Sequence, residues 1–223
     1  MPVLPDLPQT EIAIIEMTNA FRKEHNRTQL KPNAALTAAA RAFAAYLGKT
    51  GKFAHEADGR EPQERAEAAG YRYCLIAENL ALNLDSRGFE TQKLARDVVE
   101  GWKTSPGHRA NLLEKSVTEI GVGVVRAPDR HPKFISVEVF GRPESLKVTF
   151  SIENHTALAL SYRLGEESET LPARASANHT SCEGGPLVIE RAAPAAGLEP
   201  RTGDRFVLSE GPGGAIKVER RRK

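Results

Sequence analysis

The sequence predicts an α+β fold in which a mixed half of helices and strands is followed by a smaller all-β half. Apolar residues recur mainly at helical spacing up to residue 142 and mainly at every second position from residue 146 onward. In addition, 40% of the 223 residues are hydrophobic and 27% are charged. This balance is typical of a globular protein that buries a core, and it argues against a disordered chain.

Helical periodicity predicts five helices in the first half. Apolar side chains recur three or four positions apart in these stretches, and proline or a capping residue stands at several of their starts. Thr10 is the expected N-cap of the first helix. The predicted helices cover residues 10–26, a stretch after Pro32-Asn33, the stretch framed by Pro62 and Gly70, a stretch ending near Trp102, and a short one opened by Ser105-Pro106.

Two strands are expected to close this half. Residues 120–124 alternate apolar residues with glycine, and residues 134–140 show the same two-residue period. The elements do not follow a regular βαβ order, and no glycine-rich phosphate loop occurs. The sequence therefore argues against a doubly wound nucleotide-binding fold.

Alternation predicts a separate β domain after residue 145. We expect Leu146, Val148, Phe150 and Ile152 to face its core, since they alternate strictly with polar residues. Further short strands are expected at residues 158–164, 187–190, 206–209 and 215–218, which suggests a small sandwich or barrel. The expected organisation is an N-terminal arm over 1–9, a first domain over 10–142 and a β domain over 145–223.

Charge and cysteine content exclude several classes of protein. The 31 Lys and Arg against 29 Asp and Glu give a net charge of +2, and the only dense basic run is residues 220–223, so no nucleic-acid partner is expected. No stretch reaches the ~20 apolar residues of a membrane-spanning helix. No CxxC pair occurs, which excludes a zinc ribbon. Cys74 and Cys182 form either one disulfide that joins the two predicted domains or two unrelated thiols.

Four sequence phrases stand in a fixed order in the first half. The chain contains FAHEADG at 53–59, AENL at 77–80, WKTSPGHRANLL at 102–113 and GVGV at 121–124. These phrases resemble the bacterial branch of the CAP superfamily, which comprises cysteine-rich secretory, antigen 5 and pathogenesis-related proteins and contains the SCP-like domain. The resemblance covers about residues 10–142, and it implies an α-β-α sandwich for them.

The resemblance also implies a cleft lined by a His and Glu tetrad. By position in the phrases, its members here are His55, Glu78 and His108, and Ser105 stands where the second Glu would be. The tetrad is therefore incomplete. Arg109 is expected at the edge of the cleft, where it would attract an anionic ligand. Ser105 precedes a proline at a helix start, so we interpret it as a cap and not as the nucleophile of a serine hydrolase.

Two imidazoles and a carboxylate that converge on one cleft suit a divalent metal ion, most readily zinc. His55 and His108 are the expected ligands. Glu78 would either complete the ligand set or hold a water molecule and act as a base. The structural alternative is a buried, hydrogen-bonded pair of His55 and Glu78 that braces the cleft.

Two functions follow from these expectations. The resemblance favours an exported protein, periplasmic or secreted after removal of a signal peptide. Its cleft would serve as a non-enzymatic binding site for a divalent metal ion or for a small lipid, cell-envelope or protein ligand. The missing second Glu supports this interpretation. The alternative is a zinc-assisted hydrolase acting on peptide or cell-envelope material, with Glu78 as the catalytic base. The β domain contains no cluster of His, Asp, Glu and Cys, and no catalysis is assigned to it.

Overall fold

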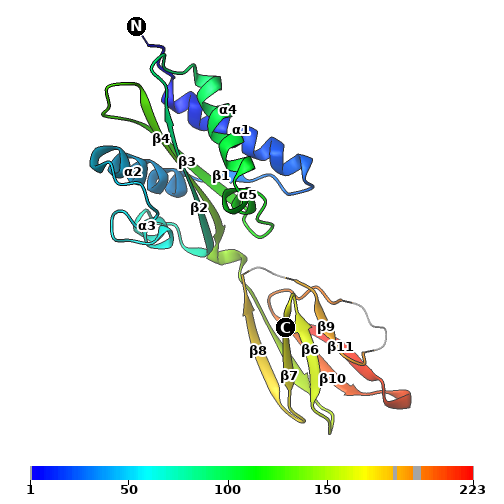
Figure 1. Ribbon diagram of the computed structural model, residues 1–223. Helices are drawn as coiled ribbons and strands as arrows, with labels where there is room; N and C mark the ends of the chain where they lie inside the picture. Colours follow the sequence, from blue (N-terminus) through cyan, green and yellow to red (C-terminus); the bar gives the residue numbers. More distant parts are fainter. Residues whose placement is uncertain (1, 183–184, 193–196, 223) are drawn as a thin grey trace. The chain divides into compact units, whose positions relative to one another are not determined.

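A four-stranded sheet lies at the centre of the first of two units into which the chain divides, Met1–Glu144 and Ser145–Lys223. The computed structural model describes residues 2–182, 185–192 and 197–222 (Figure 1). The sheet of the first unit consists of β1 (Lys31–Pro32), β2 (Tyr73–Leu84), β3 (Glu119–Ala127) and β4 (Lys133–Pro143). Its order is β1-β3-β4-β2, with β4 antiparallel to both of its neighbours and β1 parallel to β3.

Helices cover both faces of this sheet, so the first unit is the α-β-α sandwich that the resemblance implies (Figure 1). The helices are α1 (Leu7–Glu24), α2 (Ala34–Thr50), α3 (Pro62–Ala68), α4 (Thr91–Thr104) and α5 (Pro106–Leu112). One core contains side chains of α1, α4 and α5, and the other contains side chains of α2 and α3. Strand β4 serves both cores, since Phe134 and Phe140 join the first whereas Ile135 and Val137 join the second.

The glycines of β3 let α2 pack directly against the strand backbone. A Cβ atom at Gly121 would lie 2.2 Å from the amide nitrogen of Thr37, and one at Gly123 would lie 2.3 Å from the amide nitrogen of Arg41. No side chain fits at either position. The alternation of glycine and valine therefore places the helix on one face of β3 and leaves the apolar side chains on the other.

The first helix begins three residues earlier than the sequence predicts. Asp6 is its N-cap and accepts a hydrogen bond from the amide of Gln9 at 3.0 Å. Thr10, the expected cap, lies inside the helix and donates its hydroxyl to the carbonyl of Asp6. The expectation was wrong because Pro8 suits the first helical turn, which moves the helix start ahead of the apolar pattern.

Strand β2 is an element that the sequence pattern did not predict. Its centre carries the polar residues Glu78 and Asn79, both of them buried, which interrupts the alternation that identifies a strand. It is an edge strand, and β4 is its one neighbour among the described strands. Glu78, the candidate site residue, is thus fixed on a twelve-residue strand instead of a loop.

The second unit is a β-sandwich of two sheets. Residues of both sheets contribute to one core. The first sheet has the order β11-β10-β5-β8 and the second β7-β6-β9. The strands are β5 (Val148–Asn154), β6 (Leu160–Leu164), β7 (Glu167–Leu171), β8 (Ser176–Ser181), β9 (Leu187–Ile189), β10 (Asp204–Glu210) and β11 (Ile216–Arg222).

The expected inward-facing residues of β5 are buried with one exception. Phe150 and Ile152 lie in the core of the sandwich and Val148 packs against it. Leu146 is 41% exposed, which corrects its expected position. The reason is that Leu146 ends the short 3-10 turn Glu144–Leu146, so the strand begins only after it.

Neither cysteine carries a free thiol, because Cys74 and Cys182 are both disulfide-bonded. This removes the alternative of two unrelated thiols.

None of the described helices combines the length and the apolar character that crossing a membrane would require.

Candidate functional site

The site forms around the buried carboxylate of Glu78 on β2. Nδ1 of His55, in the loop after α2, lies 2.8 Å from Oε1 of Glu78. The Glu78 side chain is 1% exposed, whereas that of His55 is 49% exposed. Because an ionised carboxylate only accepts hydrogen bonds, Nδ1 of His55 carries the proton. In the neutral ring the lone pair is then on Nε2.

Arg65 of α3 is the functional partner that sequence reasoning missed. Its Nη2 donates to both carboxylate oxygens of Glu78, each at 3.0 Å, and its side chain is 5% exposed. The guanidinium carbon also lies 3.5 Å from the centre of the Phe43 ring. The available signal was an arginine within an alanine-rich helix turn, because such a position is buried and a buried charge requires a partner.

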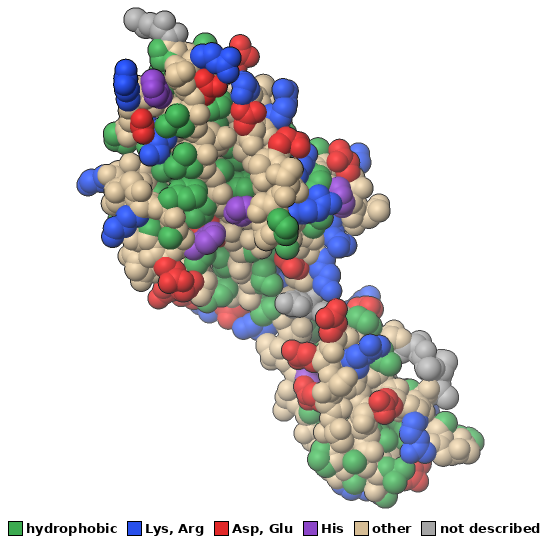
Figure 2. Space-filling model, in the orientation of Figure 1, with side chains coloured by type: hydrophobic (Ala, Val, Ile, Leu, Met, Phe, Trp, Pro, Cys, Tyr) green, Lys and Arg blue, Asp and Glu red, His purple; other side chains and the backbone are tan. Residues whose placement is uncertain are grey.

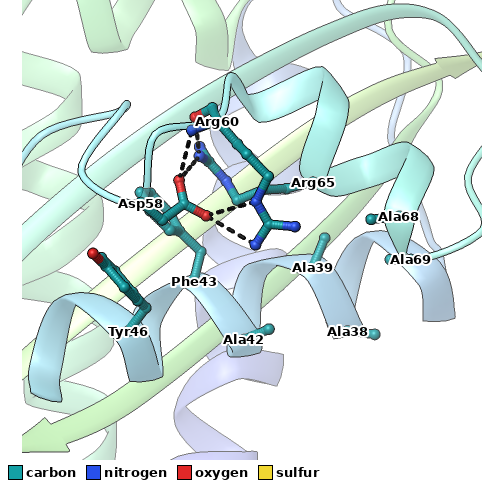
Figure 3. A pocket seen from close by; sticks show the side chains of 10 residues that line it. All are labelled: Ala38, Ala39, Ala42, Phe43, Tyr46, Asp58, Arg60, Arg65, Ala68 and Ala69. Atoms are coloured by element: carbon teal, nitrogen blue, oxygen red, sulfur yellow. Dashed lines mark hydrogen bonds and ion pairs between the residues drawn. The ribbon is translucent and has the colours of Figure 1, made fainter.

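Asp58 completes the ionic cluster from the other side of Arg65. Its Oδ1 accepts from Nη1 of Arg65 at 2.9 Å, and its Oδ2 accepts from Nε of Arg60 at 3.1 Å. Figure 3 shows both guanidinium groups converging on this carboxylate beside α2. Burial alone would raise the pKa of Asp58, but the hydrogen bonds and charges of Arg60 and Arg65 hold it below its ordinary value. The cluster therefore fixes the position of the Arg65 guanidinium between Asp58 and Glu78.

A second network attaches α5 to the edge of β2. Asn111 donates its amide to the carbonyl of Glu78 at 3.1 Å and to Oδ1 of Asn79 at 3.0 Å. Asn79 in turn donates to the carbonyl of His108 at 3.2 Å. Trp102 donates its indole N–H to the carbonyl of Leu80 at 2.9 Å. Asn111 and Trp102 thus satisfy carbonyl groups of the edge strand β2, whereas Asn79 satisfies a carbonyl of α5, and together these contacts hold α5 beside β2.

The environment drives the two histidine pKa values apart. The hydrogen bond to Glu78 raises the pKa of His55 above its ordinary value, although burial opposes this shift. Burial, followed by the charge of His55, lowers the pKa of His108. Such opposed shifts make His55 the first of the two rings to protonate on acidification. Figure 2 shows histidine side chains at the surface of the first unit among apolar ones.

Two other predicted site residues have different surroundings. Ser105 occupies the N-cap position of α5, but its hydroxyl makes no capping hydrogen bond. Arg109 donates through Nη2 to Nε2 of His25 at 3.0 Å and lies over the ring of Phe21 at 4.9 Å. Both of these partners belong to the end of α1, so the structure ties Arg109 to that helix.

Behind the site lies a buried carboxyl group on β4. Glu138 has no exposed surface and accepts a hydrogen bond from the hydroxyl of Thr18 at 2.7 Å. Asn79 connects it to the site, with an amide contact of 3.5 Å. Burial raises the pKa of Glu138 to about 8, while the hydrogen bonds of Thr18 and Asn79 and the charge of Arg22 oppose the rise.

The donor set determines which metal site the residues could form. Within the described ranges no three His, Cys, Asp or Glu side chains are grouped to hold a metal ion. Both oxygens of Glu78 are already engaged by Arg65 and His55. What remains is the imidazoles of His55 and His108, the former oriented by a carboxylate as metal-binding histidines usually are. Two imidazoles are fewer than the four ligands of a closed structural zinc centre.

Comparison with known proteins gives the same picture of the first unit. The profile of the cysteine-rich secretory protein family, CAP, matches residues 15–140, which is more than half of the chain. The uncharacterized protein YkwD of Bacillus subtilis strain 168 is 30% identical over 118 residues, which are 52% of this chain and 43% of that protein. The chain thus spans less than half of the length of that relative.

Solved structures that share the fold include two bacterial proteins. An outer surface protein of Borrelia burgdorferi matches with a TM-score of 0.52 at 23% identity, over 60% of this chain and 93% of that one. An extracellular protein of Bacillus anthracis that contains an SCP domain matches with a TM-score of 0.50 at 23% identity, over 61% of this chain and 41% of that one.

Proposed function

The chain belongs to the cysteine-rich secretory protein (CAP) family, and on that premise we propose that it is a non-catalytic binding module. Its site would take a divalent metal ion, most readily zinc, on the imidazoles of His55 and His108. Glu78 would act as a positioning residue that fixes the Nδ1 proton of His55 and so presents the Nε2 lone pair outward. A lipid, cell-envelope or protein ligand would bind at the same cleft.

The observation that carries this proposal is that both carboxylate oxygens of Glu78 are already hydrogen-bonded within the protein. A hydrolytic role needs a carboxylate that is free to take a proton from a bound water molecule. Here Arg65 contacts both oxygens, His55 contacts one of them, and the side chain is 1% exposed. A metal ion at the two histidines would supply positive charge and an open coordination position. A carboxylate engaged in this way is poorly suited to take a proton from water, which favours binding over hydrolysis.

Export is part of the proposal. The disulfide-bonded state of Cys74 and Cys182 suits an oxidising compartment, because cytosolic thiols are kept reduced. The similarity to an extracellular protein of Bacillus anthracis supports the same assignment.

Zinc titration of the full chain by calorimetry tests the proposal. We expect one weak site per chain that His55→Ala and His108→Ala each abolish. His131→Ala removes a histidine of the loop before β4 and serves as the matched control, with unchanged binding. Glu78→Gln should weaken zinc binding by about tenfold or more, as the loss of an orienting partner does. Binding that survives both variants of the site histidines would contradict the proposal.

The hydrolase alternative is distinguished by turnover. Zinc-loaded protein should leave peptide and peptidoglycan substrates intact over hours. Cleavage that depends on zinc and disappears in Glu78→Gln would overturn the binding proposal and establish Glu78 as a catalytic base.

A further inference from the structure

The first unit has a second hollow, away from the histidines. A groove of about 560 Å³ lies between α1 and α2 and reaches β3 at Val122. Ile12 and Ile15 of α1 and Pro32 of β1 give it apolar walls. Ile12 is 48% exposed although it is large and apolar. The groove shares no lining residue with the site around Glu78, and its volume suits a small organic ligand.

The outer edge of β3 is closed on both sides of the groove. Strand β1 pairs with β3 only at Glu119 and Ile120. Farther along, the carboxylate of Glu11 accepts the backbone N–H of Val124 at 3.0 Å and takes the place of a neighbouring strand. Three residues, Gly121, Val122 and Gly123, lie between these two closures. So short an edge disfavours the addition of an extended peptide as a further strand, which favours a small molecule as the occupant.

The charges that line the groove select the sign of its occupant. Glu11 is buried, and its carboxylate is held by Arg41 through Nε at 3.0 Å and through Nη2. These two charges offset each other. The exposed carboxylate of Glu16 has no ion-pair partner within the described part of the chain. The groove therefore presents one uncompensated negative charge beside an apolar surface.

We propose that the groove between α1 and α2 binds a small amphiphile whose apolar chain lies against Ile12 and Ile15 and whose cationic head group pairs with Glu16. The apolar chain removes exposed isoleucine surface from water. The head group supplies the charge that Glu16 lacks, and an anionic head group of the same size is repelled. The proposal goes beyond the metal site, since it uses none of its residues.

Calorimetry of the full chain in the presence of EDTA tests the proposal with two probes of equal chain length. Decyltrimethylammonium and decanoate are each titrated below the concentration at which they form micelles. We expect the cationic probe to bind about tenfold more tightly than the anionic one, as attraction is exchanged for repulsion at a partly exposed charge. Equal affinities, tighter binding of decanoate, or no saturable binding of either probe would overturn the proposal.

Paired variants locate the binding. Glu16→Gln should bring the two affinities within about twofold of each other. Glu24→Gln removes an exposed carboxylate from the same helix outside the groove and should leave the tenfold difference intact. Ile12→Asn should weaken both probes about fivefold, since half-buried apolar contact is lost.

Phe53→Asn is the matched control for Ile12→Asn, because Phe53 is also large, apolar and 44% exposed but lies outside the groove. It should bind both probes as the wild type does. A preference for the cation that persists in Glu16→Gln would assign the binding to another surface and contradict the proposal. Because EDTA removes divalent metal ions, failure here leaves the zinc test unaffected.

Discussion

Arg65 and Glu78 form a buried ion pair in which one guanidinium nitrogen lies 3.0 Å from each carboxylate oxygen. The side chains are 5% and 1% exposed, so the pair is screened little by water. Arg65 reaches Glu78 from α3 while His55 reaches it from the loop after α2. This pair thereby holds the helical layer that carries α2 and α3 to the edge strand on which the site is built.

Removal of the guanidinium should destabilise the fold strongly. Arg65→Gln leaves the Glu78 carboxylate buried without its charged partner, and we expect a loss of about 3–5 kcal/mol in the free energy of unfolding. Urea denaturation at pH 7 measures it. Arg65→Lys should lose less, because it keeps the charge but not the fork geometry.

Arg60→Gln is the matched control, since Arg60 also pairs with Asp58 but its side chain is 53% exposed. An exposed pair of this kind contributes about 1 kcal/mol or less. Equal losses for Arg60→Gln and Arg65→Gln would show that the buried pair with Glu78 has no special weight.

Glu138 should make the fold less stable as the pH rises. Its pKa is about 8 in the folded chain against an ordinary value of 4.5, so between these values only the unfolded state has released the proton. The free energy of unfolding should therefore fall with pH in this window, by up to about 1.4 kcal/mol per unit, and the contribution is fully present only below pH 4.5.

Glu138→Gln isolates this effect. Urea denaturation of variant and wild type from pH 5 to 8 should show the variant gaining relative stability as the pH rises, while contributions of the histidines cancel in the difference. Asp85→Asn is the control, because hydrogen bonds from Arg87 lower the pKa of Asp85 to about 2. That carboxyl is ionised in both states above pH 5. A difference between Glu138→Gln and wild type that does not vary with pH would contradict the assignment.

Two glycine substitutions should have opposite effects on stability, because one glycine lies in the close contact between β3 and α2 and the other has open space around it. Gly123→Ala places a Cβ atom 2.3 Å from the backbone of Arg41 and should cost about 1–3 kcal/mol or more through overpacking. Gly101→Ala, inside α4 with no neighbouring atom within 4 Å, should instead stabilise by about 0.5–1 kcal/mol. The melting temperatures of both variants, measured by thermal unfolding, test these expectations. A Gly123→Ala variant that is more stable than the wild type would contradict the close approach of α2 to β3.

The cysteine state gives a direct chemical test. Thiol titration of the unfolded, unreduced protein should find no free thiol, since Cys74 and Cys182 are both disulfide-bonded. Titration after reduction should find two per chain, the number of cysteines in the sequence. Two free thiols before reduction would contradict the structure and remove one support for export.

Local pattern determined most of the elements. The buried face of a helix or strand is recorded in the spacing of its apolar residues. This spacing predicted the helix around Trp102 and the strand that contains Phe150 and Ile152. The strand that contains Glu78 could not be predicted in this way, because the buried polar side chain of Glu78 interrupts the apolar pattern of β2. The short phrases indicated the family and the expected site residues, but not the contacts those residues make.

By itself the sequence determined the α+β class, the positions of most helices and strands, and the family to which residues 15–140 belong. Only the tertiary structure decided which charged side chain pairs with Glu78 and which residues Arg109 contacts. Arg65 lies 13 positions from Glu78 in the chain, and Arg109 lies 84 positions from His25, its partner. No spacing rule links such residues, because their contact depends on how helices pack across a sheet and on the need of a buried charge for a partner.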